Sequence, residues 1–175
     1  AGETFFLSEV PIEREQLKSL IERALGMTGG IAAYKAAALA RLLVKSGCDV
    51  RVAMTEAATQ FITPVTMQAL TGQVVWTDLW DPRVADNMSH IELSRDRDLI
   101  LIAPATANIL GKIRGGIADD LLSTVAMATT APVLLAPAMN TEMYAKAAVR
   151  ENVRVLAERG CRFVEPDAGE LACGT

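Results

Sequence analysis

Two long apolar runs constrain the fold of this chain more than any other feature of its sequence. Residues 97–105 read RDLILIAPA and residues 131–140 read APVLLAPAMN, and neither run alternates apolar with polar side chains. Strands with this composition are buried on both faces, as in a parallel sheet that helices cover on both sides. The helical pattern over residues 118–129, ADDLLSTVAMAT, lies between the two runs and completes a β-α-β unit.

The same alternation of strand and helix patterns extends from residue 26 onward. Helices are predicted over residues 31–47 and 149–160, each ending on a glycine that can cap it, and strands over residues 49–55 and 161–166. These repeated units predict an α/β fold with a doubly wound parallel sheet. Ligands of such sheets bind at the carboxyl ends of the strands.

The start of the chain has a different pattern. Residues 11–25, PIEREQLKSLIERAL, place apolar side chains at the spacing of an amphipathic helix. They run almost directly into GMTGG, which leaves too few residues for a regular first strand. We therefore expect an N-terminal helical extension over residues 1–25 and a separate domain over residues 26–175.

Composition excludes several classes of protein. The 175 residues, 51% of them apolar, suit one domain with a substantial core. A net charge of −4 argues against nucleic acid or acidic membranes as partners, and no apolar run approaches the roughly 20 residues that cross a bilayer. Three scattered cysteines and one histidine give no metal-ligand spacing, so we expect no metal and a reduced, cytoplasmic protein.

Polar and glycine residues follow the predicted strands, where a ligand would bind. Gly29 and Gly30 precede a helix, so this segment is either an anion-binding turn or an ordinary tight turn. Thr106 can cap a helix and bind a ligand at once. Asp119, expected with Asp120 in a first helical turn, stabilises the helix dipole or bonds a ligand ring. Asn140 is either a ligand-binding amide or a turn former.

Two further residues carry possible chemistry. His90 lies in SHIELS, where Ser89 could cap a short helix, and it is either a general base or a solvated side chain. Cys173 lies in ACG after the turn-like run EPDAGE, outside any apolar pattern. This cysteine is either incidental or carried to a site by a loop.

Six segments, in order, resemble a known family: GGIAAYK, AMTEAATQFITP, SHIELS, APATANILGKI, PAMNTEMY and ACG. The chain is similar to the phosphopantothenoylcysteine decarboxylases, a branch of the flavin-dependent cysteine decarboxylases with a flavodoxin-like, Rossmann-like three-layer architecture. The match covers about residues 26–174. In many bacteria this module is the N-terminal half of a bifunctional coenzyme A biosynthesis protein, whose other half is phosphopantothenate–cysteine ligase.

The resemblance implies a lyase that binds FMN non-covalently. Its substrate is 4′-phosphopantothenoyl-cysteine. The thiol is oxidised, CO2 leaves, and return of the electrons gives 4′-phosphopantetheine. The resemblance also implies homotrimers with FMN between two subunits and the histidine supplied by the neighbour. Bifunctional relatives build dodecamers from four trimers.

The resemblance assigns roles to individual residues. His90 matches the active-site base, Asn140 the group that binds the substrate carboxylate, and Cys173 the acid that protonates the enethiol. Met143 and Ala172 match further substrate contacts. Flavin contacts are expected at Gly29, Gly30, Ile31, Thr55, Thr106, Ala107, Asn108, Asp119, Ser123 and Ala138.

Relatives continue beyond ACG to complete a substrate lid, so we expect this chain to be a fragment with a truncated lid and no ligase domain. Two alternatives share the fold: a non-catalytic FMN-binding regulatory subunit, and a decarboxylase of peptides that end in cysteine. The joint presence of His90, Asn140 and Cys173 disfavours the first, because a pure interaction module needs none of them.

Overall fold

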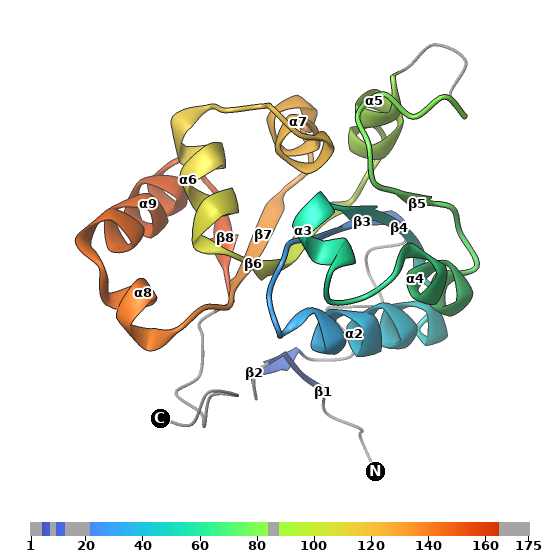
Figure 1. Ribbon diagram of the computed structural model, residues 1–175, viewed down its shortest axis with the longest axis horizontal. Coiled ribbons are helices and arrows are strands. Elements are labelled where there is room, and N and C mark those ends of the chain that lie inside the picture. The colour runs from blue at the N-terminus through green and yellow to red at the C-terminus, as the bar shows by residue number, and fades with distance from the viewer. Residues whose placement is uncertain (1–4, 8–9, 13–21, 84–87, 165–175) are drawn as a thin grey trace.

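A central parallel sheet organises the chain. The computed structural model describes residues 5–7, 10–12, 22–83 and 88–164. Within these residues, six strands form one sheet in the order β5-β4-β3-β6-β7-β8 (Figure 1). They are β3 (Glu22–Met27), β4 (Asp49–Met54), β5 (Val75–Trp76), β6 (Leu99–Ala105), β7 (Val133–Pro137) and β8 (Arg162–Phe163). A separate antiparallel pair consists of β1 (Phe5–Leu7) and β2 (Val10–Ile12).

The order of the strands confirms the predicted doubly wound parallel sheet of the flavodoxin-like and Rossmann-like class. All neighbouring strands in the sheet are parallel. The chain builds outward from β3 to β4 and β5, then returns to β6 on the other side of β3 and builds outward again. Successive strands therefore diverge between β3 and β6, and their carboxyl ends flank the switch point where such folds bind ligands.

Helices cover both faces of the sheet and give the predicted three-layer sandwich (Figure 1). One face packs against α2 (Ala33–Lys45), α3 (Glu56–Thr59) and α4 (Pro64–Thr71). The other face packs against α5 (Ser89–Ser94), α6 (Ala107–Gly115), α7 (Leu121–Ala128) and α9 (Ala147–Glu158). The short helix α8 (Thr141–Ala145) leads from β7 toward α9.

The apolar run in β6 is buried on both faces, as its composition predicts. Leu101 and Ala103 belong to the core on the α2 side, whereas Ile100 and Ile102 belong to the core on the α6 side. Each of the four side chains is no more than 4% exposed. Burial on this scale supplies the main driving force for folding around the central strands.

The predicted helix over residues 11–25 is wrong at both ends. Pro11 and Ile12 lie in β2, and residues 22–25 lie in β3; residues 13–21 lie outside the described residues. β3 pairs with β4 on one side and β6 on the other, so tertiary pairing overrides the helical spacing. Its charged first residue, Glu22, is accommodated at the edge by an ion pair of 3.1 Å with Arg97.

The Leu122 side chain of α7 packs on the backbone of β3 at Gly26. A Cβ atom at Gly26 would lie 2.3 Å from Leu122 Cδ1, so any larger residue at this position would force Leu122 to shift. α7 also packs against α5. The strand and these two helices therefore form one continuous stack.

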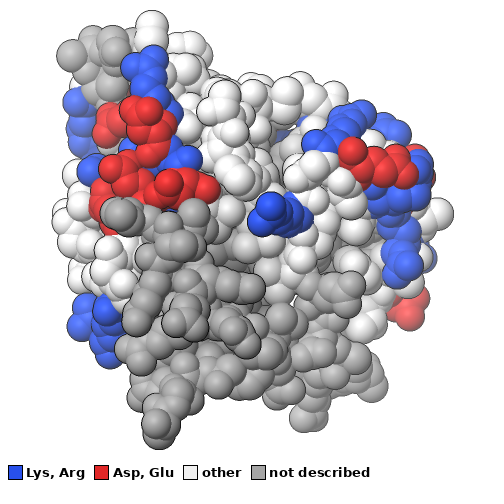
Figure 2. Space-filling view, turned by 180° about the vertical axis from the view of Figure 1, so that it is seen from behind, with Lys and Arg blue, Asp and Glu red and all other residues white. Residues whose placement is uncertain are grey.

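The charged side chains are mixed in sign. Figure 2 shows two groups of both signs at the sides of one face, with mostly uncharged surface between them. The described part of this face therefore lacks the continuous basic stripe that nucleic acids select. Among the residues that the structure describes, no helix is both long and apolar enough to cross a membrane.

Candidate functional site

The carboxyl ends of four neighbouring strands are tied together at the switch point. In each case the backbone amide of a residue just after one strand donates a hydrogen bond to an oxygen atom at the carboxyl end of a neighbouring strand. Three bonds do this: Thr55 N to Met27 O at 3.0 Å, Thr106 N to Thr28 Oγ1 at 3.2 Å, and Ala138 N to Ala105 O at 3.1 Å. The structure thus brings together the predicted positions Thr55, Thr106 and Ala138 with the turn that contains Gly29 and Gly30.

The two glycines of this turn serve close approach rather than unusual backbone angles. Neither has a positive φ. A Cβ atom at Gly29 would lie 2.6 Å from Ala57 Cβ and 2.9 Å from the Ala57 carbonyl carbon, so the turn packs on the backbone after β4. A Cβ atom at Gly30 would have its nearest neighbour, Thr106 Cγ2, at 3.9 Å. Gly30 therefore leaves open room beside Thr106.

Two helix starts border that room. The N-cap of α2 is Ala32, whose side chain cannot accept a hydrogen bond. The N-cap of α6 is Thr106, as predicted, and its hydroxyl accepts from the Ile109 amide at 3.5 Å. In the first turn of α2, Ala33 N and Lys35 N already donate to Gly30 O and Ala32 O, whereas the amides of Ala107 and Asn108 at the start of α6 are available to an anion.

Asn140 lies at the same edge, at the start of α8. Its Oδ1 accepts from the Glu142 amide at 2.8 Å, so the predicted turn-forming role is real. That bond uses only the oxygen, and the side-chain NH2 is left as the group that can bind a carboxylate. Ile31 and Met143 add exposed apolar surface at 62% and 47% exposure.

His90 is not brought to this edge within one chain. It lies in α5, at the upper right of Figure 1, whereas the turn between β3 and α2 lies at the lower centre. Ser89 does not cap the helix as predicted: Met88 is the N-cap, and the Ser89 hydroxyl donates to Leu79 O at 3.3 Å. His90 Nδ1 is buried and has no hydrogen-bond partner among the described residues.

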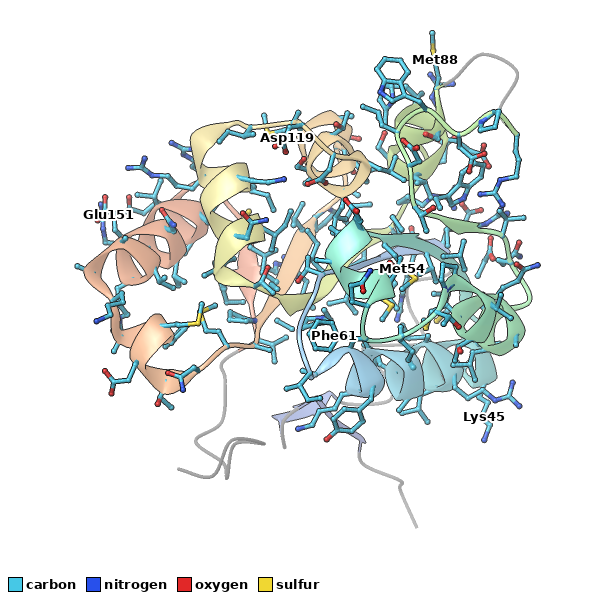
Figure 3. The ribbon with its side chains drawn as sticks, in the orientation of Figure 1. Lys45, Met54, Phe61, Met88, Asp119 and Glu151 are labelled. Atoms are coloured by element: carbon cyan, nitrogen blue, oxygen red, sulfur yellow. The ribbon has the colours of Figure 1, made fainter. Side chains whose placement is uncertain are left out.

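Two weaker predictions also lie apart from the strand ends. Asp119 is on the loop between α6 and α7 (Figure 3), where its carboxylate lies 2.6 Å from Lys112 Nζ. Ser123 is fully buried and completes a capping box with Asp120 at the start of α7. Both side chains thus have structural partners, and their flavin contacts stay predictions. Ala172 and Cys173 lie outside the described residues.

The capping carboxylate of α7 makes stability depend on pH. Asp120 accepts from the Ser123 amide at 2.8 Å and from Lys112 Nζ at 2.6 Å. Partial burial acts to raise the pKa of Asp120, but Lys112 and the Ser123 amide outweigh it and hold the pKa below its usual value. This carboxylate therefore stabilises the fold above its unfolded pKa, and the contribution is lost as pH falls through the lower folded pKa.

Asp120→Asn should lower the unfolding free energy at pH 7 by about 1 kcal/mol, because asparagine keeps the cap but loses the charge. The difference from wild type should shrink toward pH 3 in urea unfolding. Asp119→Asn is the matched control, since it removes the more exposed partner of Lys112 and should cost less. An equal loss for Asp120→Asn at both pH values would contradict the ion-pair contribution.

Sequence reasoning missed Thr28, which links β3 to β6 from a buried position. The only signal was a hydroxyl residue between an apolar strand and two glycines. It also missed Ala57, the close neighbour of Gly29. In the described part of the chain, no cluster of three or more His, Cys, Asp or Glu side chains could hold a metal ion.

The fold and the site define a class of protein. A glycine turn and a capped helix start, adjacent at the switch point of a doubly wound sheet, are typical of proteins that bind a phosphorylated nucleotide-like cofactor. The chain belongs to the Flavoprotein family, whose model matches residues 11–175. This match begins ahead of the predicted domain boundary at residue 26.

Curated relatives agree with the resemblance seen in the sequence. The coenzyme A biosynthesis bifunctional proteins CoaBC of Escherichia coli and Bacillus subtilis are 51% and 50% identical over 150 residues, which is 86% of this chain. The chain spans 37% of the length of each of these relatives.

Solved structures are similar over most of their length. The FMN-dependent cysteine decarboxylase SpaF has a TM-score of 0.76 at 34% identity, over 85% of this chain and 86% of that one. A mutant PPC decarboxylase complexed with pantothenoylaminoethenethiol also has a TM-score of 0.76, at 31% identity, over 88% of this chain and 86% of that one.

Proposed function

We propose that this chain is the FMN-binding decarboxylase module of a cytoplasmic coenzyme A biosynthesis enzyme. It would convert 4′-phosphopantothenoyl-cysteine to 4′-phosphopantetheine and CO2. The observation that carries the proposal is the junction of the glycine turn with the start of α6 at the switch point. Relatives named for coenzyme A biosynthesis and for FMN-dependent cysteine decarboxylation support it.

The residues present fit FMN. Gly30 leaves room where a side chain would otherwise stand, and the adjacent start of α2 lacks a side-chain cap. A phosphate there would be bound by amides of the turn and of α6. The remaining proposed contacts are Ile31, Thr55, Ala107, Asn108 and Ala138, with Asp119 and Ser123 as weaker candidates. When bound, FMN supplies the oxidation of the substrate thiol and the return reduction, so the net reaction is loss of CO2.

The side chains of the protein would bind substrate and move protons. The NH2 of Asn140 donates to the substrate carboxylate and orients it, and Met143 packs nearby. Cys173 gives a proton to the enethiol, since a thiol with a pKa of roughly 8.5 is mostly protonated at neutral pH. Ala172 lies beside it in sequence and contacts the substrate. His90 acts as the base.

His90 would serve the site of a neighbouring subunit in a homotrimer. Its separation from Asn140 and from the glycine turn within one chain supports this arrangement (Figure 1). Met88 begins the His90 helix and projects outward at 51% exposure (Figure 3), and Trp80 is 71% exposed. Exposed apolar side chains of this size suit a subunit contact. A bifunctional protein that contains this module would assemble further into dodecamers.

An absorbance spectrum before and after anaerobic addition of phosphopantothenoylcysteine tests the proposed function. We expect a yellow protein whose flavin bands change on addition of substrate, with release of CO2. A yellow protein that ignores this substrate would favour the regulatory subunit, or the peptide decarboxylase if a peptide ending in cysteine is consumed instead. A colourless protein that FMN cannot reconstitute would reject the flavin site.

A further inference from the structure

Thr28 joins the two halves of the sheet at the switch point. Its side chain is 2% exposed. The Oγ1 hydroxyl donates to Pro104 O at 2.6 Å and accepts from Thr106 N at 3.2 Å. A hydroxyl can donate and accept at once, and this one does both to a segment more than 70 residues away in the chain.

These two bonds begin where the strand pairing ends. The ladder between β3 and β6 stops at the pair Gly26 and Ile102. Pro104 has no N–H and cannot continue it, and the register of β6 with β7 is itself irregular between Ile102 and Ala105. Beyond the ladder, the hydrogen bonds of the Thr28 side chain therefore connect the segments after β3 and β6, as backbone hydrogen bonds connect the strands elsewhere in the sheet.

The two segments that Thr28 joins each carry anion-binding amides. Gly29 and Gly30 follow Thr28 directly in the chain. Thr106 is the N-cap of α6, and its amide donates the hydrogen bond to Thr28 Oγ1. The Thr28 hydroxyl thus sets the position of the glycine turn relative to the start of α6.

We propose that Thr28 is a positioning residue for the cofactor phosphate: it holds the amides of the glycine turn and of α6 at the spacing at which both bind one phosphate group. This inference rests on the proposed FMN site. Preorganised donors bind an anion more tightly than donors that must be ordered on binding. Thr28 itself does not contact the phosphate, and it acts only by positioning the amides that do.

The inference predicts a loss that depends on the phosphate. Thr28→Val keeps the shape of the side chain and removes the hydroxyl. It should weaken FMN binding about tenfold, whereas binding of riboflavin, which lacks the phosphate, should change less than about twofold. Thr28→Ser keeps the hydroxyl and should bind both flavins as wild type does. The dissociation constants are measured on flavin-free protein by quenching of flavin fluorescence.

Thr71→Val is the matched control. Thr71 is 9% exposed, and its hydroxyl donates to Met67 O at 2.9 Å and accepts from Gln73 N at 3.3 Å. Both valine variants should lower the melting temperature, but only Thr28→Val should lower the preference for FMN over riboflavin. If Thr28→Val does not fold, Thr28→Cys provides the comparison with Thr28→Ser, because a thiol is a weaker hydrogen-bonding group.

An unchanged preference for FMN over riboflavin in Thr28→Val or Thr28→Cys, with wild type preferring FMN, would overturn the inference alone. An equal loss of that preference in Thr71→Val would also overturn it, because the effect would then follow general stability. Wild-type protein that binds neither flavin would instead reject the proposed function on which the inference rests.

Discussion

Gly29→Ala should weaken FMN binding about a hundredfold and lower the unfolding free energy by about 1–3 kcal/mol. The new methyl group would lie 2.6 Å from Ala57 Cβ and 2.9 Å from two backbone atoms of the same residue. Contacts this short with backbone cannot be relieved by rotation of a side chain. The glycine turn must therefore move away from the end of β4, and its amides move out of line with the start of α6. Titration with FMN and urea unfolding measure the two effects.

Two alanine variants separate the packing effect from the ligand effect. Gly111→Ala places a methyl group 3.6 Å from Asn152 Nδ2 inside α6, where alanine is the better helix former, so stability should rise or stay unchanged. Gly30→Ala makes no contact shorter than 3.9 Å within the chain. It should therefore keep its stability but bind FMN more weakly, because the methyl group enters the room meant for the ligand. Normal FMN binding by Gly29→Ala would show that the turn does not bind the cofactor.

His90→Asn should lower kcat at least about a hundredfold and leave FMN binding unchanged, since a positioned general base contributes on that scale. FMN binding is spared because the proposed phosphate contacts lie on the glycine turn and on α6, whereas His90 lies on α5. Steady-state release of CO2 and the flavin spectrum report the two quantities. Wild-type turnover by this variant would remove His90 from the mechanism.

Coexpression of two inactive variants tests whether His90 acts across subunits. His90→Asn retains Asn140, and Asn140→Asp retains His90 but repels the substrate carboxylate. In randomly mixed assemblies, about a quarter of shared sites combine an intact Asn140 with a neighbour's intact His90, so about that share of activity should return. Each variant expressed alone is the control. No recovery in assemblies shown to be mixed would mean that His90 serves its own chain.

Much of the fold could be predicted because its signals are local. A window of about ten residues is enough to recognise the apolar runs of β6 and β7 and the helices α2 and α9, which are followed by glycines. β3 could not be recognised in the same way. It carries Glu22 and Arg23, charges that a central strand seldom holds, and its helical spacing competes with pairing to two distant strands.

The residues of the candidate site likewise differ in whether a local sequence signal points to them. Gly29, Thr106 and Asn140 could be singled out because polar and glycine residues at strand ends are a general signal of the fold. Thr28 could not, because its role depends on Pro104, and nothing near Thr28 in sequence points there. The separation of His90 from the strand ends is likewise a property of the folded chain and has no local signature.

The close packing of Leu122 on Gly26 affects the relative positions of β3, α7 and also α5. α5 packs on α7, and Leu122 of α7 packs on the backbone of β3, so directly packed elements link the glycine turn to His90. In an assembly of the proposed kind, each subunit would therefore hold His90 at a set distance from its own glycine turn. If His90 serves a neighbouring copy as proposed, identical copies can close into a ring only at a rotation that matches this separation, so the contact between Gly26 and Leu122 would help to determine the symmetry of the assembly.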